Sequence, residues 1–384
     1  MKKSNSIISS IVLLASLTAC SSNDMPVQHS DQYDNITFTV ETQKVATRAN
    51  EYVKYDSNIH PEQMGVFGYQ AASQQSGQAM PNVFDNQKVT FDKTQSTWEY
   101  GEPKKWEDYK DARFFDFLAY MPYHENTANT ENKASITIQT DAANKTETYT
   151  LSVPYNPTTY ASASPFLFDS KSAPIICALP EHREVKNADG TKKSFNHTVQ
   201  FKFDQTLIGY KLLFKLDPKM GAIRQFHIKK VQIIGEIPTS GTITRNFTYD
   251  KNTQEWTAEG IEWTDTTLQT FTNDNPVIIP YKESTLVVTS TDYAQWGGTF
   301  YTIPNKAFEP TIQVTYDVEM KAQDGTTPVT REDVTSSIIL NNSNFNSFNS
   351  SATATTYPIR ILIQPRYLYV LTDQDAYTGH LLID

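Results

Sequence analysis

The stretch TIQVTYDVEM, residues 311–320, alternates apolar and polar residues along its whole length. Successive side chains of a β-strand point to opposite faces, so this alternation predicts a strand with one buried face. The same pattern recurs from one end of the chain to the other, in ITFTV (36–40), ETYTLSV (147–153), HTVQFKFD (197–204) and YPIRILI (357–363). Few windows show helical spacing. The sequence therefore predicts an all-β protein.

The length and composition fit β-sandwiches rather than one small domain. At 384 residues the chain is long enough for about two domains, each with its own core. It holds 21 Tyr and 20 Phe against 14 Gly, and aromatic residues favour half-buried strands. Asp-Gly pairs in ADGT (188–191) and QDGTT (323–327) are typical of hairpin turns. Regular spacing of strands and turns predicts sandwiches over the whole chain.

A charged stretch without apolar rhythm, EHREVKNADGTKK (181–193), predicts the boundary between two domains. We expect the first domain to cover 21–180, with its strands between Ile36 and Pro180. The second is expected to cover 181–384, with its strands from Ser194 onward.

The N-terminus has the organisation of a secretory signal, with Lys2 and Lys3 before an apolar run that is too short to span a bilayer. Its end, Leu17-Thr18-Ala19-Cys20, resembles the lipobox of bacterial lipoproteins. The resemblance implies that residues 1–20 hold the signal, that the chain is cut before Cys20, and that this thiol is acylated. No Asp directly follows the cysteine, which favours the outer membrane or cell surface. An ordinary signal with an incidental cysteine, or a buried helix, is the alternative.

Several functional classes lack support in the sequence. The net charge is −10 and no block of Lys or Arg occurs, so a nucleic-acid partner has no electrostatic footprint. Neither a phosphate loop nor an HExxH, CxxC or G-x-S-x-G motif appears, and the seven His are scattered, so we expect no enzyme, metal or cofactor. Two carboxylates on distant strands can still form a glycosidase pair, but none is singled out. Cys177, in APIICALP, reads as a buried apolar thiol.

The order of several aromatic segments resembles the fimbrillin family, the type V pilus subunits of Bacteroidales. After the lipobox come KVATRAN, MGVFGYQ, TWEYGEPKKWEDYKDARFFDFLAYMPY, FNHTVQFKF, PVIIPY and YTIPNKAFEPTIQVTYDVEM. The family usually has an aromatic residue where this chain has the Met of AYMP. The resemblance implies two transthyretin-like Greek-key β-sandwiches in tandem, exported as a lipoprotein and assembled with other fimbrial subunits.

The resemblance also implies that an Arg-specific protease removes the first strand. Arg48-Ala49 in ATRAN matches the cleavage site, although a plain surface arginine is the alternative. The strand to be removed carries Ile36, Phe38 and Val40 on one face, so it can cover the edge of a core. A cut after Arg48 would sever this strand and the lipid anchor together.

The C-terminus offers a strand to replace the one removed. A lead rich in Asn, Ser and Thr (341–356) precedes segments that are apolar at alternate positions. The candidate donor residues are Ile359, Ile361, Ile363, Tyr367, Tyr369 and Leu371. The alternative is that these segments are simply the last strands of the second sandwich.

Two functions from different classes follow. The first is a stalk subunit or tip adhesin of a cell-surface fimbria, with a host protein or glycan as ligand. The second is a monomeric outer-membrane lipoprotein that binds glycans through exposed aromatic platforms, with candidates Trp98, Trp106, Trp256, Trp263 and Trp296.

Overall fold

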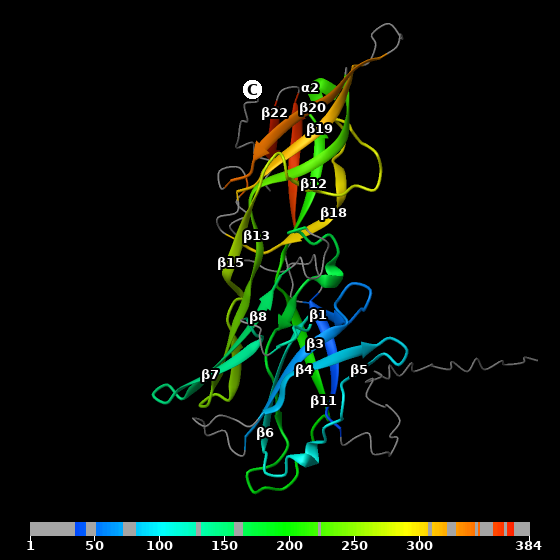
Figure 1. Cartoon of the computed structure of the whole chain (residues 1–384). Helices are drawn as coiled ribbons and strands as arrows, with labels where there is room; N and C mark the ends of the chain where they lie inside the picture. The colour runs from blue at the N-terminus through cyan, green and yellow to red at the C-terminus, as the bar shows by residue number, and fades with distance from the viewer. Residues whose placement is uncertain are drawn as a thin grey trace, which may run out of the picture.

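Two hydrophobic cores lie end to end along an elongated molecule, each between two β-sheets (Figure 1). The computed structural model describes residues 35–43, 51–71, 82–127, 132–156, 164–221, 224–305, 309–320, 328–341, 345, 356–364 and 367–371. Nearly all of the regular structure in this part of the chain is β-strand, which confirms the predicted all-β class. The Greek-key order stays a prediction.

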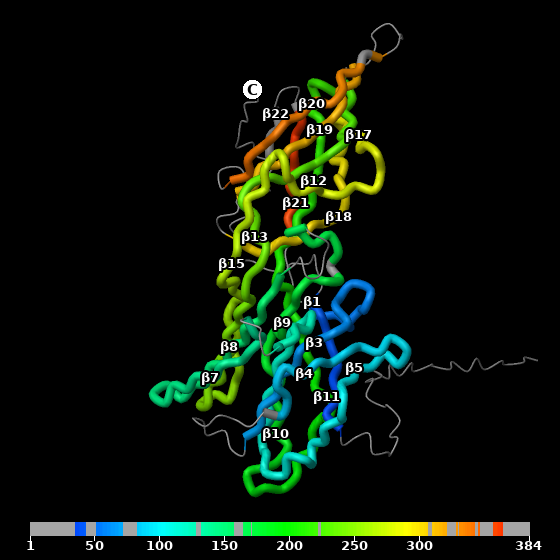
Figure 2. Tube along the Cα trace, in the orientation of Figure 1, coloured from blue at the N-terminus to red at the C-terminus, as the bar shows by residue number. Residues whose placement is uncertain are grey.

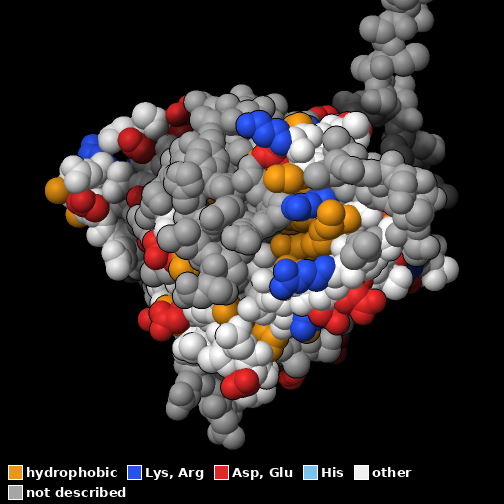
Figure 3. Space-filling view, turned by 90° about the horizontal axis from the view of Figure 1, so that it is seen from above, with side chains coloured by type: hydrophobic (Ala, Val, Ile, Leu, Met, Phe, Trp, Pro, Cys, Tyr) orange, Lys and Arg blue, Asp and Glu red, His pale blue; other side chains and the backbone are white. Residues whose placement is uncertain are grey.

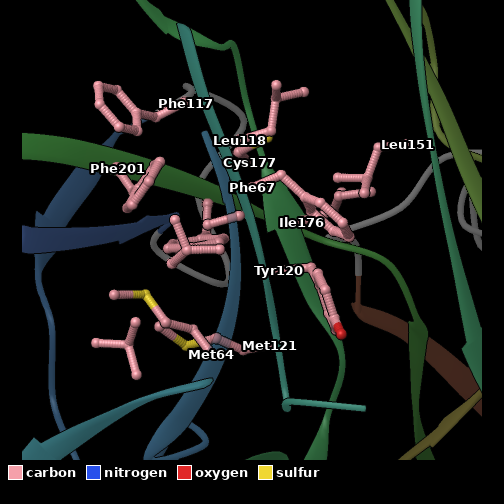
Figure 4. Packing of buried hydrophobic residues seen from close by; sticks show 14 of the residues in the cluster. Met64, Phe67, Phe117, Leu118, Tyr120, Met121, Leu151, Ile176, Cys177 and Phe201 are labelled. Atoms are coloured by element: carbon pink, nitrogen blue, oxygen red, sulfur yellow. The ribbon is translucent and has the colours of Figure 1, made fainter. Parts of the chain in front are cut away.

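The first lobe is built on a nine-stranded sheet. Its main path runs β2-β1-β11-β9-β6-β3-β4-β5, and β10 pairs with β6. The strands are β1 (Thr37–Gln43), β2 (Tyr52–Lys54), β3 (Gln63–Ala71), β4 (Asn82–Asp92), β5 (Thr97–Glu99), β6 (Phe114–Met121), β9 (Ile175–Cys177), β10 (Glu181–Glu184) and β11 (Thr198–Gln205). Side chains from β3, β6, β9 and β11 meet in its core, as the labelled residues of Figure 4 show.

A second nine-stranded sheet follows the order β20-β19-β13-β8-β7, and β14, β15, β16 and β17 also pair with β13. Its strands are β7 (Ser135–Asp141), β8 (Thr146–Tyr155), β13 (Arg224–Asp250), β14 (Glu255–Ala258), β15 (Glu262–Phe271), β16 (Val277–Ile278), β17 (Leu286–Val288), β19 (Thr311–Met320) and β20 (Val329–Ile339). A four-stranded sheet, β18-β12-β21-β22, completes the second lobe. It contains β12 (Ile208–Leu216), β18 (Ala294–Thr302), β21 (Thr356–Gln364) and β22 (Tyr367–Leu371). In the described residues the helical pieces are η2 (Trp106–Asp108), η3 (Ser170–Ser172) and α2 (Pro218–Gly221).

The 27-residue strand β13 belongs to both lobes, and Figure 2 traces it from one to the other. Its first part pairs with β19, and its last part, from Gly241 onward, pairs with β8. Ile233 and Ile237 accordingly lie in the second core, whereas Ile243 and Phe247 lie in the first. Between the two parts, Gly235 has a φ of 123°, a conformation that side-chain-bearing residues rarely adopt.

The division into lobes differs from the boundary expected at 181–193. Both β10 and β11 pair within the first sheet, and the chain enters the second lobe between β11 and β12. The charged stretch forms β10 and a turn in which Asn187 N donates to Thr191 O at 2.9 Å. Glu184 binds Arg113 and Lys193 there. The polar composition thus marks a solvated turn with ion pairs, not a linker.

Arg245 joins the two layers of the first lobe. This β13 side chain is nearly buried, and its Nη1 donates to Asp204 Oδ2 at 2.7 Å and to Cys177 O at 3.0 Å. Its Nε donates to Glu259 O at 3.1 Å. Cys177 is buried as expected, and burial raises the pKa of its thiol to about 12. A buried charge with this many partners is costly to leave unpaired.

Arg245→Met should lower the free energy of unfolding by roughly 3–5 kcal/mol, because Asp204 would lose its counter-charge in a desolvated site. Lys193→Met, which removes a more exposed partner of Glu184, should cost less than about 1 kcal/mol. Urea unfolding of both variants measures the difference. Equal losses would contradict the cross-layer role of Arg245.

Candidate functional site

Strand β1 lies next to β11 and is parallel to it, with Cα partners running from Thr37↔Thr198 to Thr42↔Phe203. On its other side it pairs antiparallel with the short strand β2. Among the strands that the structure describes, only β1–β11 and β12–β21 are parallel pairs. A parallel neighbour is never a hairpin partner, so no tight turn ties β1 to β11.

The inward face of β1 is fully integrated in the first core. Ile36, Phe38 and Val40 are at most 5% exposed, while Thr39 between them faces solvent. The Phe38 ring centroid lies 5.7 Å from that of Phe84, 5.6 Å from that of Tyr100 and 5.7 Å from that of Phe201. We call the space that these inward side chains fill the β1 groove. Emptying it would forfeit roughly 5–9 kcal/mol of burial, at about 1.5–3 kcal/mol per side chain.

Backbone contacts hold β1 at both ends. Near its start, the Tyr100 hydroxyl donates to Ile36 O at 2.7 Å, and Ile36 N donates to Lys104 O at 2.8 Å. Near its end, Tyr55 N donates to Val40 O at 3.2 Å. These groups belong to the segments that would remain if β1 were removed.

One polar pair closes the inward row of β1. Thr42 Oγ1 lies 3.0 Å from His60 Nε2, and both residues are buried. Burial lowers the pKa of His60 to about 4, although Asp56 opposes the shift, so the ring is neutral at neutral pH. No motif in the sequence singles out this histidine. Its only signal was Thr42, which continues the alternate positions of Ile36, Phe38 and Val40.

The predicted donor residues lie in the second lobe of the same chain. Ile359, Ile361 and Ile363 are fully buried in the second core, where β21 lies between β12 and β22. Tyr367, Tyr369 and Leu371 belong to β22, which pairs antiparallel with β21. In this arrangement these segments are the last strands of the second sandwich, which was the alternative from the sequence. A donor role stays a prediction.

Cys20, Arg48 and Ala49 lie outside the described residues, so lipidation and cleavage stay predictions. The chain order nevertheless places Arg48 between the end of β1 at Gln43 and the start of β2 at Tyr52. A cut there would leave β1 without a covalent link to the lobe it fills.

The tryptophans do not form the expected exposed platforms. Trp98, Trp106 and Trp296 are buried, and the indole nitrogens of the last two donate to His197 O and Ile279 O. Trp256 and Trp263 are half-buried against the first core.

Seen from above, the molecule shows hydrophobic side chains flanked by Lys and Arg (Figure 3), a mixture that is common on protein surfaces.

Within the described ranges, no group of three or more His, Cys, Asp or Glu residues could hold a metal ion. No helix in those ranges is both long and apolar enough to cross a membrane.

Neither a protein-family model nor a curated protein matches the chain. Solved structures do resemble it over most of its length. A fimbrial protein from Bacteroides vulgatus has 15% identity and a TM-score of 0.41, covering 91% of this chain and 99% of that one. A protein provisionally described as a cell adhesion protein, from Bacteroides uniformis, has 14% identity and a TM-score of 0.41, covering 88% and 95%. A fimbrial protein from Bacteroides ovatus has 10% identity and a TM-score of 0.31, covering 90% and 54%.

Identities of 15% or less and TM-scores below 0.5 carry no functional argument by themselves. The function is therefore inferred from the strands of this chain.

Phe38→Ala should lower the free energy of unfolding by about 3–5 kcal/mol, because it empties a space lined by three aromatic rings. Thr39→Ala on the solvent face should cost less than about 1 kcal/mol. Urea unfolding of the uncut chain measures both. A loss for Phe38→Ala no larger than that for Thr39→Ala would contradict the packing of β1.

Stability should fall by about 3 kcal/mol between pH 7 and pH 4 through His60 alone. Below pH 6.5 the His60 ring is protonated in the unfolded chain but stays neutral in the folded one, so the free energy of unfolding falls as the pH is lowered. The fall ends near pH 4, where His60 is protonated in the folded state too. Unfolding of the wild-type chain and of His60→Gln at pH 7, 5.5 and 4 isolates this part. Identical pH profiles would contradict it.

Proposed function

We propose that the chain is a structural subunit of a cell-surface fimbria, exported as a lipoprotein and assembled by replacement of β1. The observation that carries the proposal is the position of β1 itself. Its inward face is buried, it is parallel to its main partner, and its covalent link to the rest of the lobe runs through residues 44–50, which contain Arg48.

Cleavage after Arg48 would release two things at once. The acylated Cys20 and β1 both lie on the N-terminal side of the cut, so the lobe would be freed from the membrane and β1 would be held by non-covalent contacts alone. Its dissociation would expose an apolar groove and the unpaired edge of β11. An open edge of this kind accepts an extended strand from another chain.

The energetic scale favours refilling of the groove. A loss of roughly 5–9 kcal/mol is comparable to the entire net stability of a typical domain, about 5–15 kcal/mol. A cut subunit with an empty groove therefore has little net stability left. A subunit with a neighbour's strand in place of β1 buries the apolar surface of the groove again. This difference drives association without an external energy source.

The donor comes from the C-terminal strands of a neighbouring subunit. Strand β22 ends its sheet, and β21 is its one neighbour in the strand order, so β22 can leave its own lobe with the loss of a single ladder. Release of β21 would empty three isoleucine sites in the second core. Release of β22 thus breaks one strand ladder, whereas release of β21 breaks two.

A chain that has both a groove from which β1 can leave and a C-terminal strand that can be donated suits the repeating stalk of a filament. The glycan-binding alternative rested on exposed tryptophans, three of which are buried. We propose no enzymatic activity and no cofactor. Fimbrial subunits are the expected partners.

Treatment of the lipid-free chain with an Arg-specific protease should produce heat-labile oligomers, seen as a ladder when the samples are run unboiled. Arg48→Ala should abolish the ladder, because β1 would stay covalently attached. Arg331→Ala, on the exposed surface of β20, should leave the ladder unchanged. Oligomers that persist in Arg48→Ala would refute the cut site, and a wild-type chain that is cut but stays monomeric would refute strand replacement.

A further inference from the structure

The β1 groove accommodates one polar side chain as well as apolar ones, because the last of the inward side chains of β1 makes a hydrogen bond. His60 Nε2 lies 3.0 Å from Thr42 Oγ1, with both side chains buried. The turn that carries His60 touches β1 through Tyr55 N, but it also has contacts of its own, since His60 N donates to Asp56 O at 3.1 Å and the Tyr55 hydroxyl donates to Pro61 O at 2.9 Å. The Tyr55 ring also packs 4.9 Å from the ring of Phe91 and 4.9 Å from that of Trp98. These contacts within the remaining chain keep the His60 ring beside the fourth inward position of β1.

A strand that replaces β1 must supply a hydrogen-bond partner for Nε2 of His60. An apolar side chain at the position of Thr42 would bury the His60 nitrogen without a partner, and a buried unsatisfied polar group is penalised. A site built to hydrogen-bond a hydroxyl rejects an analogue that lacks it far more strongly than an apolar pocket rejects one missing methylene. His60 thus selects for Thr or Ser at one position and fixes the register of the incoming strand.

From this requirement, and resting on the proposed function, we infer that the C-terminal segment of a second copy of this chain enters the β1 groove with Thr372 against His60. In this register Leu368, Val370 and Thr372 replace Phe38, Val40 and Thr42 at alternate positions. Two of the three positions keep the residue type of β1. Parallel to β11, Leu368 comes opposite Val199 and Thr372 opposite Phe203, as their β1 counterparts do now.

The match is local. Arg366 falls at the position of Ile36, which is fully buried, so a charged side chain must extend out of that end of the groove and the apolar correspondence covers only the part from Phe38 to Thr42. At that end the backbone contacts to Tyr100 and Lys104 do not depend on the side chain and remain available to any strand.

Other registers of the C-terminus fail at His60. A strand with Ile359, Ile361 and Ile363 inward would place Pro365 there, which has neither a hydroxyl nor a backbone N–H. A slip by one residue would turn Tyr367, Tyr369 and Leu371 inward and set the carboxylate of Asp373 in the buried site. The hydroxyl requirement therefore separates the candidate donor segments that apolar patterning alone leaves equal.

The test uses the full lipid-free chain cut by an Arg-specific protease, which is inhibited before a fluorescent peptide of residues 364–375 is added. Fluorescence anisotropy should show binding of the wild-type peptide. Thr372→Val in the peptide should weaken binding about tenfold or more. Tyr369→Phe removes a hydroxyl from the opposite face of the strand and should change the affinity less than about twofold.

A change in the protein provides an independent check. In a His60→Leu chain the preference should disappear or reverse, because an apolar wall no longer penalises the Thr372→Val peptide. The peptide variants test the register without altering the folded chain, so the result does not depend on the stability of His60→Leu.

The outcomes separate this inference from the proposed function. Equal binding of the wild-type and Thr372→Val peptides would overturn the register and leave strand replacement intact. Binding of a peptide of residues 34–45, which contains β1, but not of residues 364–375 would overturn the C-terminal segment as occupant. If neither peptide bound, both the inference and the replaceable groove would be refuted.

Discussion

The parallel pairing of β1 with β11 over an aromatic core is the interaction on which the first lobe depends. Phe38 fills a space between three rings contributed by β4, β11 and Tyr100. In a sheet whose strands are all joined by tight turns, each strand is covalently linked to the strand that it pairs with. Here the core is completed by a strand whose only covalent link to the lobe is the segment before β2, so burial and covalent attachment can be separated by one cut.

The fold class and the inward face of β1 could be predicted because both follow from period-two alternation, which is local in the sequence. Ile36, Phe38 and Val40 lie where that alternation places them. The observed passage from the first lobe to the second, between β11 and β12, could not be predicted, because the charged composition of 181–193 is typical of a solvated turn and of a linker equally. Only long-range pairing shows that β11 completes the first sheet.

The polar end of the groove was hidden for a related reason. His60 and Thr42 are 18 residues apart and meet only when the turn before β3 folds back under β1. Likewise, the burial of Trp98, Trp106 and Trp296 depends on which face of each strand meets a core. An aromatic residue in a strand has the same local pattern whether it stacks on a ligand or on its neighbours.

The continuity of β13 has a mechanical consequence for the proposed filament subunit. A pull along the long axis of the two lobes runs along one unbroken backbone, while the hydrogen bonds that this strand makes with β19 and β8 lie across the direction of load. Those bonds are sheared together rather than peeled one at a time. The junction between the lobes should consequently resist a pull along the long axis better than a junction made of a loop alone.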